Sequence, residues 1–236
     1  MACSLGIVTG LQEEAALLMA GPVGGLADVR VLCHGMGPKR AGRAAQALLE
    51  AGCTALMSFG IAGGLDPALG PGALVLAERV REQDQPHHAV DAAWRARLVA
   101  VLTAAGQGAH GGCLTGSARV VMTPAAKTAL GRAQEAVAVD MESDAVAIAA
   151  HGAGVPFLVV RAVSDPATAA IPKAVLGGVD REGYRRVPAV VRSLAKRPWD
   201  LPGLLRLRRD TGVALATLGR VAAATGGRFA VDQIAG

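Results

Sequence analysis

Short apolar runs alternate with longer amphipathic stretches through the first 165 residues of the chain. The runs span four to seven residues, are rich in Val, Leu and Ile, and are flanked by Gly, Pro or Asp, which predicts β-strands. Several of them lack polar alternation, as is typical of strands buried on both faces. The predicted strands are Leu5–Thr9, Val29–Cys33, Ala55–Phe59, Leu74–Val80, Val137–Asp140 and Phe157–Ala162.

The stretches between these runs have the spacing of amphipathic helices. Pro38 and Pro124 stand at the first positions of two of them, where the missing N–H of proline costs nothing. Alternating strands and helices predict an α/β domain with a mainly parallel central mixed sheet flanked by helices. The predicted helices are Gln12–Ala20, Pro38–Ala51, Ala92–Ala105, Pro124–Arg132 and Ser143–Ala150.

The pattern changes after Asp165, where a Pro- and Gly-containing connection runs to Gly183. Two further helices are predicted at Pro188–Lys196 and Leu201–Ala224. We take residues 1–193 as the main domain and residues 194–236 as a basic, amphipathic helical extension. The extension is too short to form a core of its own.

Composition narrows the class of protein. Hydrophobic residues make up 52% of the 236, which is too many for a disordered chain, and aromatics make up 3%, which argues against stacking on nucleobases. We therefore expect no nucleic-acid partner. The net charge is +5, and Arg192–Arg228 alone carries eight basic against two acidic residues. This basic tail favours an anionic surface, a membrane or an acidic partner.

Targeting and metal signals are weak. Met1–Gly10 lacks the pattern of a signal peptide, and no window of about 18 apolar residues is free of charge, so we expect a cytoplasmic protein without a membrane span. The four cysteines are scattered and are expected to be reduced and buried; they are Cys3, Cys33, Cys53 and Cys113.

The histidines give no metal signal. His87 and His88 lie in a polar loop, Glu82–His88, without metal-ligand spacing, so no metal is expected.

Glycine-rich turns and acidic residues follow the predicted strands, and the carboxyl ends of parallel strands are where ligands bind in such sheets. The glycine turns alone are better explained as ordinary turns, because none has the spacing of a dinucleotide fingerprint or a P-loop. This makes a nicotinamide dehydrogenase a poor candidate. The segments are Gly10–Glu14, His34–Arg40, Gly60–Gly64, Asp140–Glu142 and Arg161–Asp165.

The carboxylates are more informative than the glycines. Asp140, Glu142 and Asp165 lie at or just past the ends of apolar strands, where a charge is costly unless it is paired or used. Each has an ordinary alternative, such as a helix N-terminal acid for Glu142 or a turn former for Asp165. Glu14 fits a solvated first-turn residue equally well. Their joint arrangement favours function.

Three segments of the chain resemble one known family. Val139–Ser143 reads VDMES, Gly154–Phe157 reads GVPF, and Val160–Asp165 reads VRAVSD. Together they resemble the superfamily of purine nucleoside phosphorylases and methylthioadenosine/S-adenosylhomocysteine nucleosidases. Gly6–Ala15, Gly35–Gly37 and Gly60–Gly64 are similar to its nucleosidase branch, and the likeness covers roughly residues 5–165. The long basic tail most resembles the hopanoid-associated branch, which removes adenine from adenosylhopane.

The resemblance implies roles for individual residues. Asp165 matches the acid at purine N7, and Glu14 matches the base that positions the attacking water. Glu142 matches the carboxylate that holds the ribose 2′- and 3′-hydroxyls, and Met141 packs beneath the ribose. Arg161 is implied as structural support or as the partner of Asp165. The remaining implied substrate contacts are Gly60, Ile61, Ala62, Gly63 and Val120, the last in a predicted strand around Ser117–Val121.

These residue types suit the cleavage of an N-glycosidic bond. The ribose becomes oxocarbenium-like and the leaving purine becomes negative, so an acid near the base and carboxylates near the sugar lower the barrier. Ser58 occupies a position that holds a phosphate-binding arginine in phosphorylases, and Ile61 stands where nucleosidases often have Ser. These departures favour water over phosphate as the nucleophile. Phosphorolysis stays open through Lys39, Arg40 or Arg43.

The resemblance implies a purine nucleoside substrate with an apolar 5′ group, most specifically adenosylhopane. It also implies a homo-oligomer that needs no cofactor. Phosphate would be a co-substrate if the reaction is phosphorolytic. The alternatives are a methylthioadenosine/S-adenosylhomocysteine nucleosidase and a non-enzymatic peripheral nucleoside-binding protein. Leu201–Ala224, with Trp199 as an anchor, fits a helix at the inner membrane surface. It fits a helix packed over the core or on a second subunit slightly better.

Overall fold

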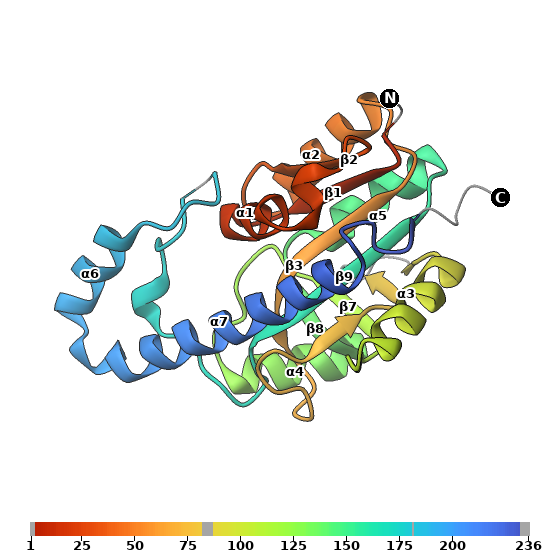
Figure 1. Cartoon of the computed structure of the whole chain (residues 1–236). Coiled ribbons are helices and arrows are strands. Elements are labelled where there is room, and N and C mark those ends of the chain that lie inside the picture. The colour runs from red at the N-terminus through yellow and green to blue at the C-terminus, as the bar shows by residue number, and fades with distance from the viewer. Residues whose placement is uncertain (1–2, 82–86, 181, 232–236) are drawn as a thin grey trace.

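The computed structural model describes residues 3–81, 87–180 and 182–231. In this part of the chain one mixed, mostly parallel sheet is flanked by helices, which confirms the predicted α/β class (Figure 1). The strand order is β2-β1-β3-β8-β7-β5-β6, with β9 beside β3 and β4. The strands are β1 Leu5–Thr9, β2 Val29–Cys33, β3 Leu56–Gly64, β4 Leu74–Leu76, β5 Arg79–Arg81, β6 His88–Ala89, β7 Cys113–Gly116, β8 Ala136–Asp140 and β9 Phe157–Asp165.

Four details of the predicted strands are wrong. The run Leu74–Val80 is two strands, β4 and β5, that pair with different partners. The segment Ser117–Val121 is irregular, and the strand before it, β7, was not predicted. The glycine segment after Phe59 is no turn, because β3 continues through it to Gly64 and pairs with β9 and β8. The last strand, β9, likewise runs on to Asp165.

The predicted helices are present, and local chemistry explains where some of them begin. The Asp91 carboxylate accepts a hydrogen bond from the Trp94 N–H at 2.7 Å, and the Thr123 hydroxyl accepts from the Ala126 N–H at 3.2 Å, so each side chain caps the helix that follows it. The helices are α1 Gln12–Ala20, η1 Pro22–Gly25, α2 Pro38–Glu50, α3 Ala92–Ala104, α4 Pro124–Gln134, α5 Ser143–Ala153, η2 Lys173–Val175, α6 Val187–Lys196, η3 Pro198–Asp200 and α7 Leu201–Ala224, the η elements being short 3₁₀ helices.

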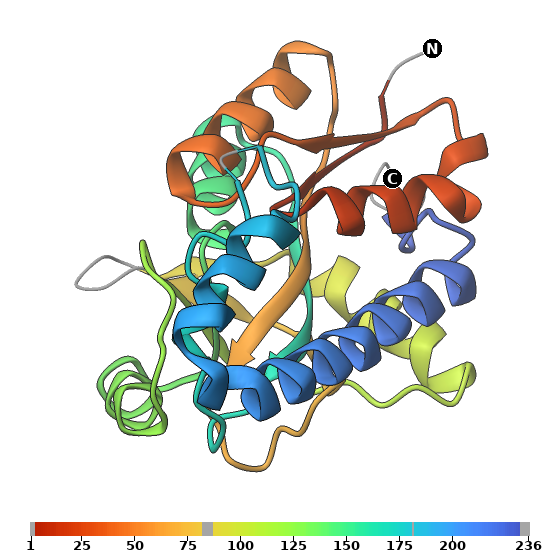
Figure 2. The same cartoon turned by 90° about the vertical axis from the view of Figure 1, so that its left-hand side faces the viewer.

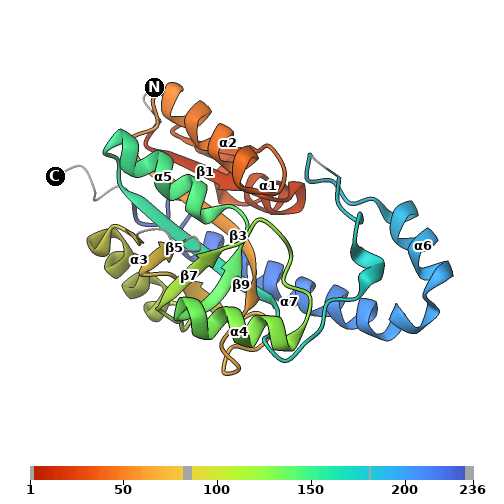
Figure 3. The same cartoon turned by 180° about the vertical axis from the view of Figure 1, so that it is seen from behind.

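The helices α2 and α5 lie side by side on one face of the sheet, and α7 crosses the other face beside α1 and α3 (Figures 1 and 3). The second half of α7 is part of the main core, with Ala214, Leu218 and Val221 fully buried. The indole N–H of Trp94 also donates to the Phe229 carbonyl at 2.6 Å. This half of the extension therefore packs on the sheet and is not available to a membrane.

Among the described residues no helix is both long enough and apolar enough to cross a bilayer.

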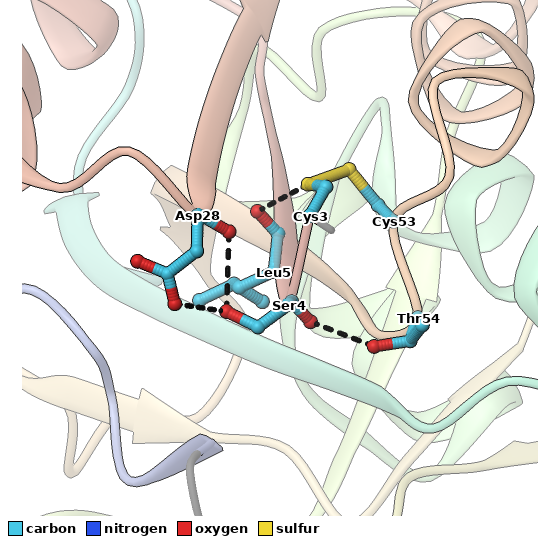
Figure 4. The surroundings of a disulfide bond; sticks show 6 residues. All are labelled: Cys3, Ser4, Leu5, Asp28, Cys53 and Thr54. Atoms are coloured by element: carbon cyan, nitrogen blue, oxygen red, sulfur yellow. Dashed lines mark hydrogen bonds between the residues drawn. A yellow bond between two sulfur atoms is a disulfide. The ribbon is translucent and has the colours of Figure 1, made fainter. Parts of the chain in front are cut away.

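The structure corrects the expectation that all cysteines are reduced. Cys3 and Cys53 form a disulfide between the N-terminal strand region and the turn before β3, with Cα atoms 4.3 Å apart (Figure 4). Both residues are buried, and their backbones form a parallel bridge that brings the side chains together. Cys33 and Cys113 are free thiols.

Candidate active site

A cavity of about 160 Å³ opens at the carboxyl ends of β1, β8 and β9. Glu14 reaches it from the first turn of α1, Glu142 from the N-terminus of α5, and Asp165 from the end of β9. The three carboxyl groups are widely separated in the sequence and line one cavity. The remaining lining residues are Gly10, Leu11, Met36, Ile61, Ala62, Gly63, Arg119, Val120, Val121, Val139, Asp140, Met141, Ser164 and Ile171.

Glu14 is held by three backbone N–H groups. Its Oε2 accepts from Gly10 and Leu11 at 3.0 Å each, and its Oε1 accepts from Ile61 at 2.8 Å. The carboxylate is almost completely buried, and burial raises its pKa, while the nearby Arg161 charge and the backbone donors lower it. The side chain is therefore fixed in orientation and is a stronger proton acceptor than an exposed glutamate.

Glu142 follows β8 and precedes α5. Its Oε1 accepts from the Gly37 N–H at 3.0 Å, and its Oε2 lies 3.7 Å from Nη2 of Arg161. Burial raises the pKa of Glu142 to about 7; Arg161 opposes the rise, whereas Asp140 adds to it. Because this pKa is close to neutral, small changes in pH change the charge that the cavity presents.

Asp165 is paired with a lysine. Nζ of Lys127, on α4, lies 2.6 Å from Oδ2 of Asp165, and the Ser164 hydroxyl donates to Oδ1 at 2.7 Å. The same ammonium donates to the main-chain carbonyls of Asp165, Pro166 and Ala169 at 3.0 to 3.1 Å, so it is completely satisfied although fully buried. Burial raises the pKa of Asp165, and Lys127 counteracts this rise.

A second buried ion pair joins Arg161, behind the cavity, to Asp140, which lines it. Nη2 of Arg161 is 2.6 Å from Oδ2 of Asp140 and donates to the Ser58 hydroxyl at 2.6 Å. The Ser143 hydroxyl donates to the Asp140 carboxylate and lies 3.0 Å from the Ser58 hydroxyl, which closes the network. The guanidinium thus neutralises Asp140 and reduces the repulsion between the buried acids, Glu14 and Glu142 included.

Close approach explains three of the glycines. A Cβ at Gly10 would lie 2.9 Å from the Glu142 carboxyl, and one at Gly60 would lie 2.5 Å from both Oε1 of Glu14 and Nη1 of Arg161. A Cβ at Gly63 would approach Oδ2 of Asp165 to 3.1 Å. Side chains at these positions would therefore displace the acids that line the cavity.

Most of the substrate contacts implied by the sequence line the cavity, namely Met141, Glu142, Ile61, Ala62, Gly63 and Val120. Gly60 and Arg161 do not line it and lie behind Glu14. The implied pairing of Arg161 with Asp165 is wrong, because Arg161 pairs with Asp140 and Lys127 pairs with Asp165.

Sequence reasoning missed several residues of the site. Lys127 carried no signal beyond its place in a predicted helix, because its partner lies 38 positions away. Met36 lies within a segment that was noted, and Arg119 and Ile171 were not singled out, yet all three line the cavity. Arg119 is the only cationic side chain among the described lining residues.

The residues considered for phosphate lie elsewhere. Ser58 is fully buried, and its hydroxyl accepts a hydrogen bond from Arg161. Lys39, Arg40 and Arg43 are not among the described residues that line the cavity. The loop Glu82–His88 is described only at its last two residues. His87 Nδ1 lies 4.0 Å from Sγ of Cys113, and the His88 ring lies 5.1 Å from that of His151.

The geometry permits acid–base chemistry on a small ligand. Among the carboxyls that line the cavity, Asp165 has a raised pKa and a partner lysine, and Glu14 and Glu142 also have raised pKa values. Such an arrangement allows a proton to be given at one point and accepted at another, and it favours positive charge developing between the carboxylates.

A family model described as the phosphorylase superfamily matches residues 5–192. A comparison with curated protein sequences gave no match.

Solved structures resemble the fold over most of the chain. The 5′-methylthioadenosine/S-adenosylhomocysteine nucleosidase of Neisseria meningitidis, in complex with methylthio-immucillin-A, is 18% identical, with a TM-score of 0.71 over 95% of this chain and 99% of that one. A Helicobacter pylori nucleosidase mutant with 5′-methylthioadenosine in its active site is 16% identical, with a TM-score of 0.68 over 94% of this chain and 99% of that one. Futalosine hydrolase of Helicobacter pylori is 20% identical, with a TM-score of 0.63 over 70% of this chain and 88% of that one.

Proposed function

Since the chain belongs to the phosphorylase superfamily and is an enzyme, we propose that it hydrolyses the N-glycosidic bond of a purine nucleoside. The single observation that supports this reaction most strongly is the convergence of Glu14, Glu142 and Asp165 on one cavity of about 160 Å³. Each of these acids has a raised pKa, as expected of groups that exchange protons or stabilise charge.

Asp165 is the proposed general acid. When the bond to the sugar breaks, its electron pair stays on the purine, and a proton delivered to N7 neutralises the new charge. The raised pKa of Asp165 favours the protonated form that this step needs, and Lys127 with Ser164 fixes the carboxyl in place. Val120, Val121 and Ile171 add apolar side chains to the lining of the same cavity.

Glu142 and Met141 are the proposed ribose contacts. An ionised Glu142 accepts hydrogen bonds from the 2′- and 3′-hydroxyls and stabilises positive charge on the ring. Met141 also lines the cavity and can pack beneath the sugar. The hydrogen bond from the Gly37 N–H to Oε1 restricts the orientation of the Glu142 carboxylate, which supports this role.

Glu14 is the proposed base for the nucleophile. A water molecule adds its oxygen to C1′ while one of its protons passes to Glu14, and the C1′–N bond breaks as the purine receives a proton from Asp165. Three backbone N–H groups hold the carboxylate of Glu14 in a fixed direction. Water is the preferred nucleophile because Arg119 is the only cation among the described lining residues and the other phosphate candidates lie elsewhere.

The finer substrate proposal is a purine nucleoside with an apolar 5′ group, with adenosylhopane as the specific candidate. The cavity is smaller than the roughly 300–1,000 Å³ of pockets for drug-sized ligands, so a large 5′ group has to extend beyond it. Leu11 and Met36 offer apolar contacts beside Gly10, near the proposed ribose position. A lipid-linked substrate also implies a cytoplasmic protein that works at the inner membrane surface.

Release of free base from adenosylhopane, 5′-methylthioadenosine and inosine, each with and without phosphate, tests the proposal. Hydrolysis predicts adenine release without phosphate and, in ¹⁸O-labelled water, a ribose product that carries the label at C1′. Release that requires phosphate would establish phosphorolysis. Tight adenine binding without turnover of any nucleoside would establish a binding protein.

A further inference from the structure

Exposed apolar side chains gather on one projection of the molecule. The helix α6 and the first turns of α7 stand away from the body (Figures 1 and 3), and Figure 2 shows α6, in light blue, from its outer side; no residue of α6 is buried. Trp199, in η3 between the two helices, is 70% exposed, which is unusual for tryptophan. We call the following exposed residues the docking face: Tyr184, Val187, Val191, Trp199, Leu201 and Leu205.

The spacing of these residues gives each helix one apolar side. Val187 and Val191 are four positions apart on α6, and Leu201 and Leu205 are four positions apart on α7, so each pair shares a side of its helix. In the second half of α7 Ala214, Leu218 and Val221 are buried, whereas in the first half Leu201 and Leu205 are exposed and Leu204 and Leu207 are half-buried. The docking face is therefore apolar surface that the described chain leaves uncovered.

Positive charge surrounds the docking face. Residues 185–209 contain eight basic residues and one acidic residue, Asp200, whose carboxylate is occupied by the Ala174 N–H at 2.9 Å. Arg185 pairs with Glu13, and Arg209 pairs with Asp210. Within the described chain no ion pair involves the other six cations, which are Arg186, Arg192, Lys196, Arg197, Arg206 and Arg208.

We infer that the docking face binds an anionic lipid bilayer. Exposed aliphatic side chains, a tryptophan at the tip and unpaired arginines and lysines are what a helix needs to lie in the interface of such a membrane. A second copy of the chain is a poorer occupant, because a two-fold contact would place two surfaces of the same positive charge against each other.

The hairpin beside the docking face approaches one residue of the cavity lining. In this short hairpin, which joins the docking face to the body, Val179 and Arg185 form an antiparallel bridge. At its turn the Gly183 carbonyl accepts from the Gln12 N–H at 3.2 Å, and a Cβ at Gly183 would lie 2.8 Å from the Gly10 carbonyl oxygen. Gly10 lines the cavity. If the proposed function holds, a substrate can keep its apolar 5′ group in the bilayer while its nucleoside enters the cavity.

Vesicle flotation of the full chain tests the inference. Vesicles of phosphatidylcholine with phosphatidylglycerol are compared with vesicles of phosphatidylcholine alone, and binding is expected only to the anionic vesicles. The double variant Arg192→Gln/Lys196→Gln should lower the partition coefficient about thirtyfold, since each basic residue near an anionic surface contributes about fivefold. Val191→Ser/Trp199→Ser should lower it at least tenfold.

Matched controls lie outside the docking face. Ile148, on α5, is 53% exposed, and Arg132, on α4, is exposed, so Ile148→Ser and Arg132→Gln should bind vesicles like the parent. Equal binding by all variants, or no binding to anionic vesicles, would overturn the inference. So would loss of a dimer, measured by light scattering, in the Val191→Ser/Trp199→Ser variant without any change in vesicle binding.

Release of adenine from a soluble nucleoside separates this inference from the proposed function. The docking variants should cleave 5′-methylthioadenosine at the parental rate, because none of the changed residues lines the cavity. Vesicle binding that depends on the docking face, in a protein that cleaves no nucleoside, would support the inference while contradicting the proposed function.

Discussion

Nζ of Lys127 lies 2.6 Å from Oδ2 of Asp165, and this pair, in which the lysine is fully buried, joins α4 to the end of β9. The ammonium also binds three main-chain carbonyls around the same carboxylate, so it fixes both the side chain and the backbone of Asp165. Lys127 does not line the cavity and would act as a positioning residue for the proposed acid.

The variant Lys127→Met should lower kcat by about 10²-fold, because a misplaced acid loses its alignment with the leaving base. Lys127 lowers the pKa of Asp165, so its removal should also shift the alkaline limb of the rate profile to higher pH. Kinetics as a function of pH measure both effects. Lys173→Met, at an exposed lysine, is the control, and a lower kcat with an unchanged pH profile would reduce Lys127 to a structural role.

The pH dependence of kcat/KM should show the titration of Glu142. Its pKa of about 7 lies above the ordinary 4.5, so the residue is protonated at pH 6 and ionised at pH 8. Only the ionised form accepts both ribose hydroxyls, so kcat/KM should rise with pH along an acid limb whose midpoint lies at about pH 7. The measurement is kcat/KM as a function of pH with a nucleoside that has no ionisable group in this pH range. A midpoint of the acid limb near pH 4.5 would contradict the prediction.

The variant Gly60→Ala should impair both folding and activity. Its Cβ would lie 2.5 Å from Oε1 of Glu14 and Nη1 of Arg161, so one of these buried groups must move. We expect a loss of about 1–3 kcal/mol in the free energy of unfolding, measured with urea, together with a lower kcat. Gly70→Ala is the matched control, because a Cβ there meets nothing within 4 Å. Equal behaviour of the two variants would refute the close approach at Gly60.

The variant Arg161→Met should destabilise the fold by about 3–5 kcal/mol, because it leaves the buried Asp140 carboxylate without its counter-ion. Adding Asp140→Asn should restore part of the loss, since the unpaired charge is then removed as well. Urea unfolding of the two single variants and the double variant measures the coupling. Strictly additive losses would show that the pair does not act as a unit.

Local patterns were sufficient to predict much of the fold. The runs Leu5–Thr9 and Val29–Cys33 are continuous and apolar enough to identify β1 and β2 to the residue. The strand β7 was missed because Cys113–Gly116 is short, mixed in polarity and flanked by glycine. Gly60–Gly64 was interpreted as a turn, because glycine in a buried strand is justified only by neighbours such as Glu14 and Asp165.

Contacts between distant segments could not be predicted in this way. The disulfide joins positions 3 and 53, and no spacing rule distinguishes that pair from the other cysteines. The two halves of α7 have similar apolar spacing, yet Leu218 is buried by the sheet and Leu205 is exposed. The acids were identified because their places after strands follow from the order of elements, whereas the identity of their partners depends on the three-dimensional packing.

The central claim is most directly tested by the rate of adenine release from 5′-methylthioadenosine or adenosylhopane in acid-to-amide variants. Glu14→Gln, Glu142→Gln and Asp165→Asn should each lower kcat/KM by about 10²-fold or more while remaining folded. Glu13→Gln and Asp66→Asn, at neighbouring or similar acids outside the cavity, should retain the parental rate. Parental rates in the three cavity variants would contradict the account.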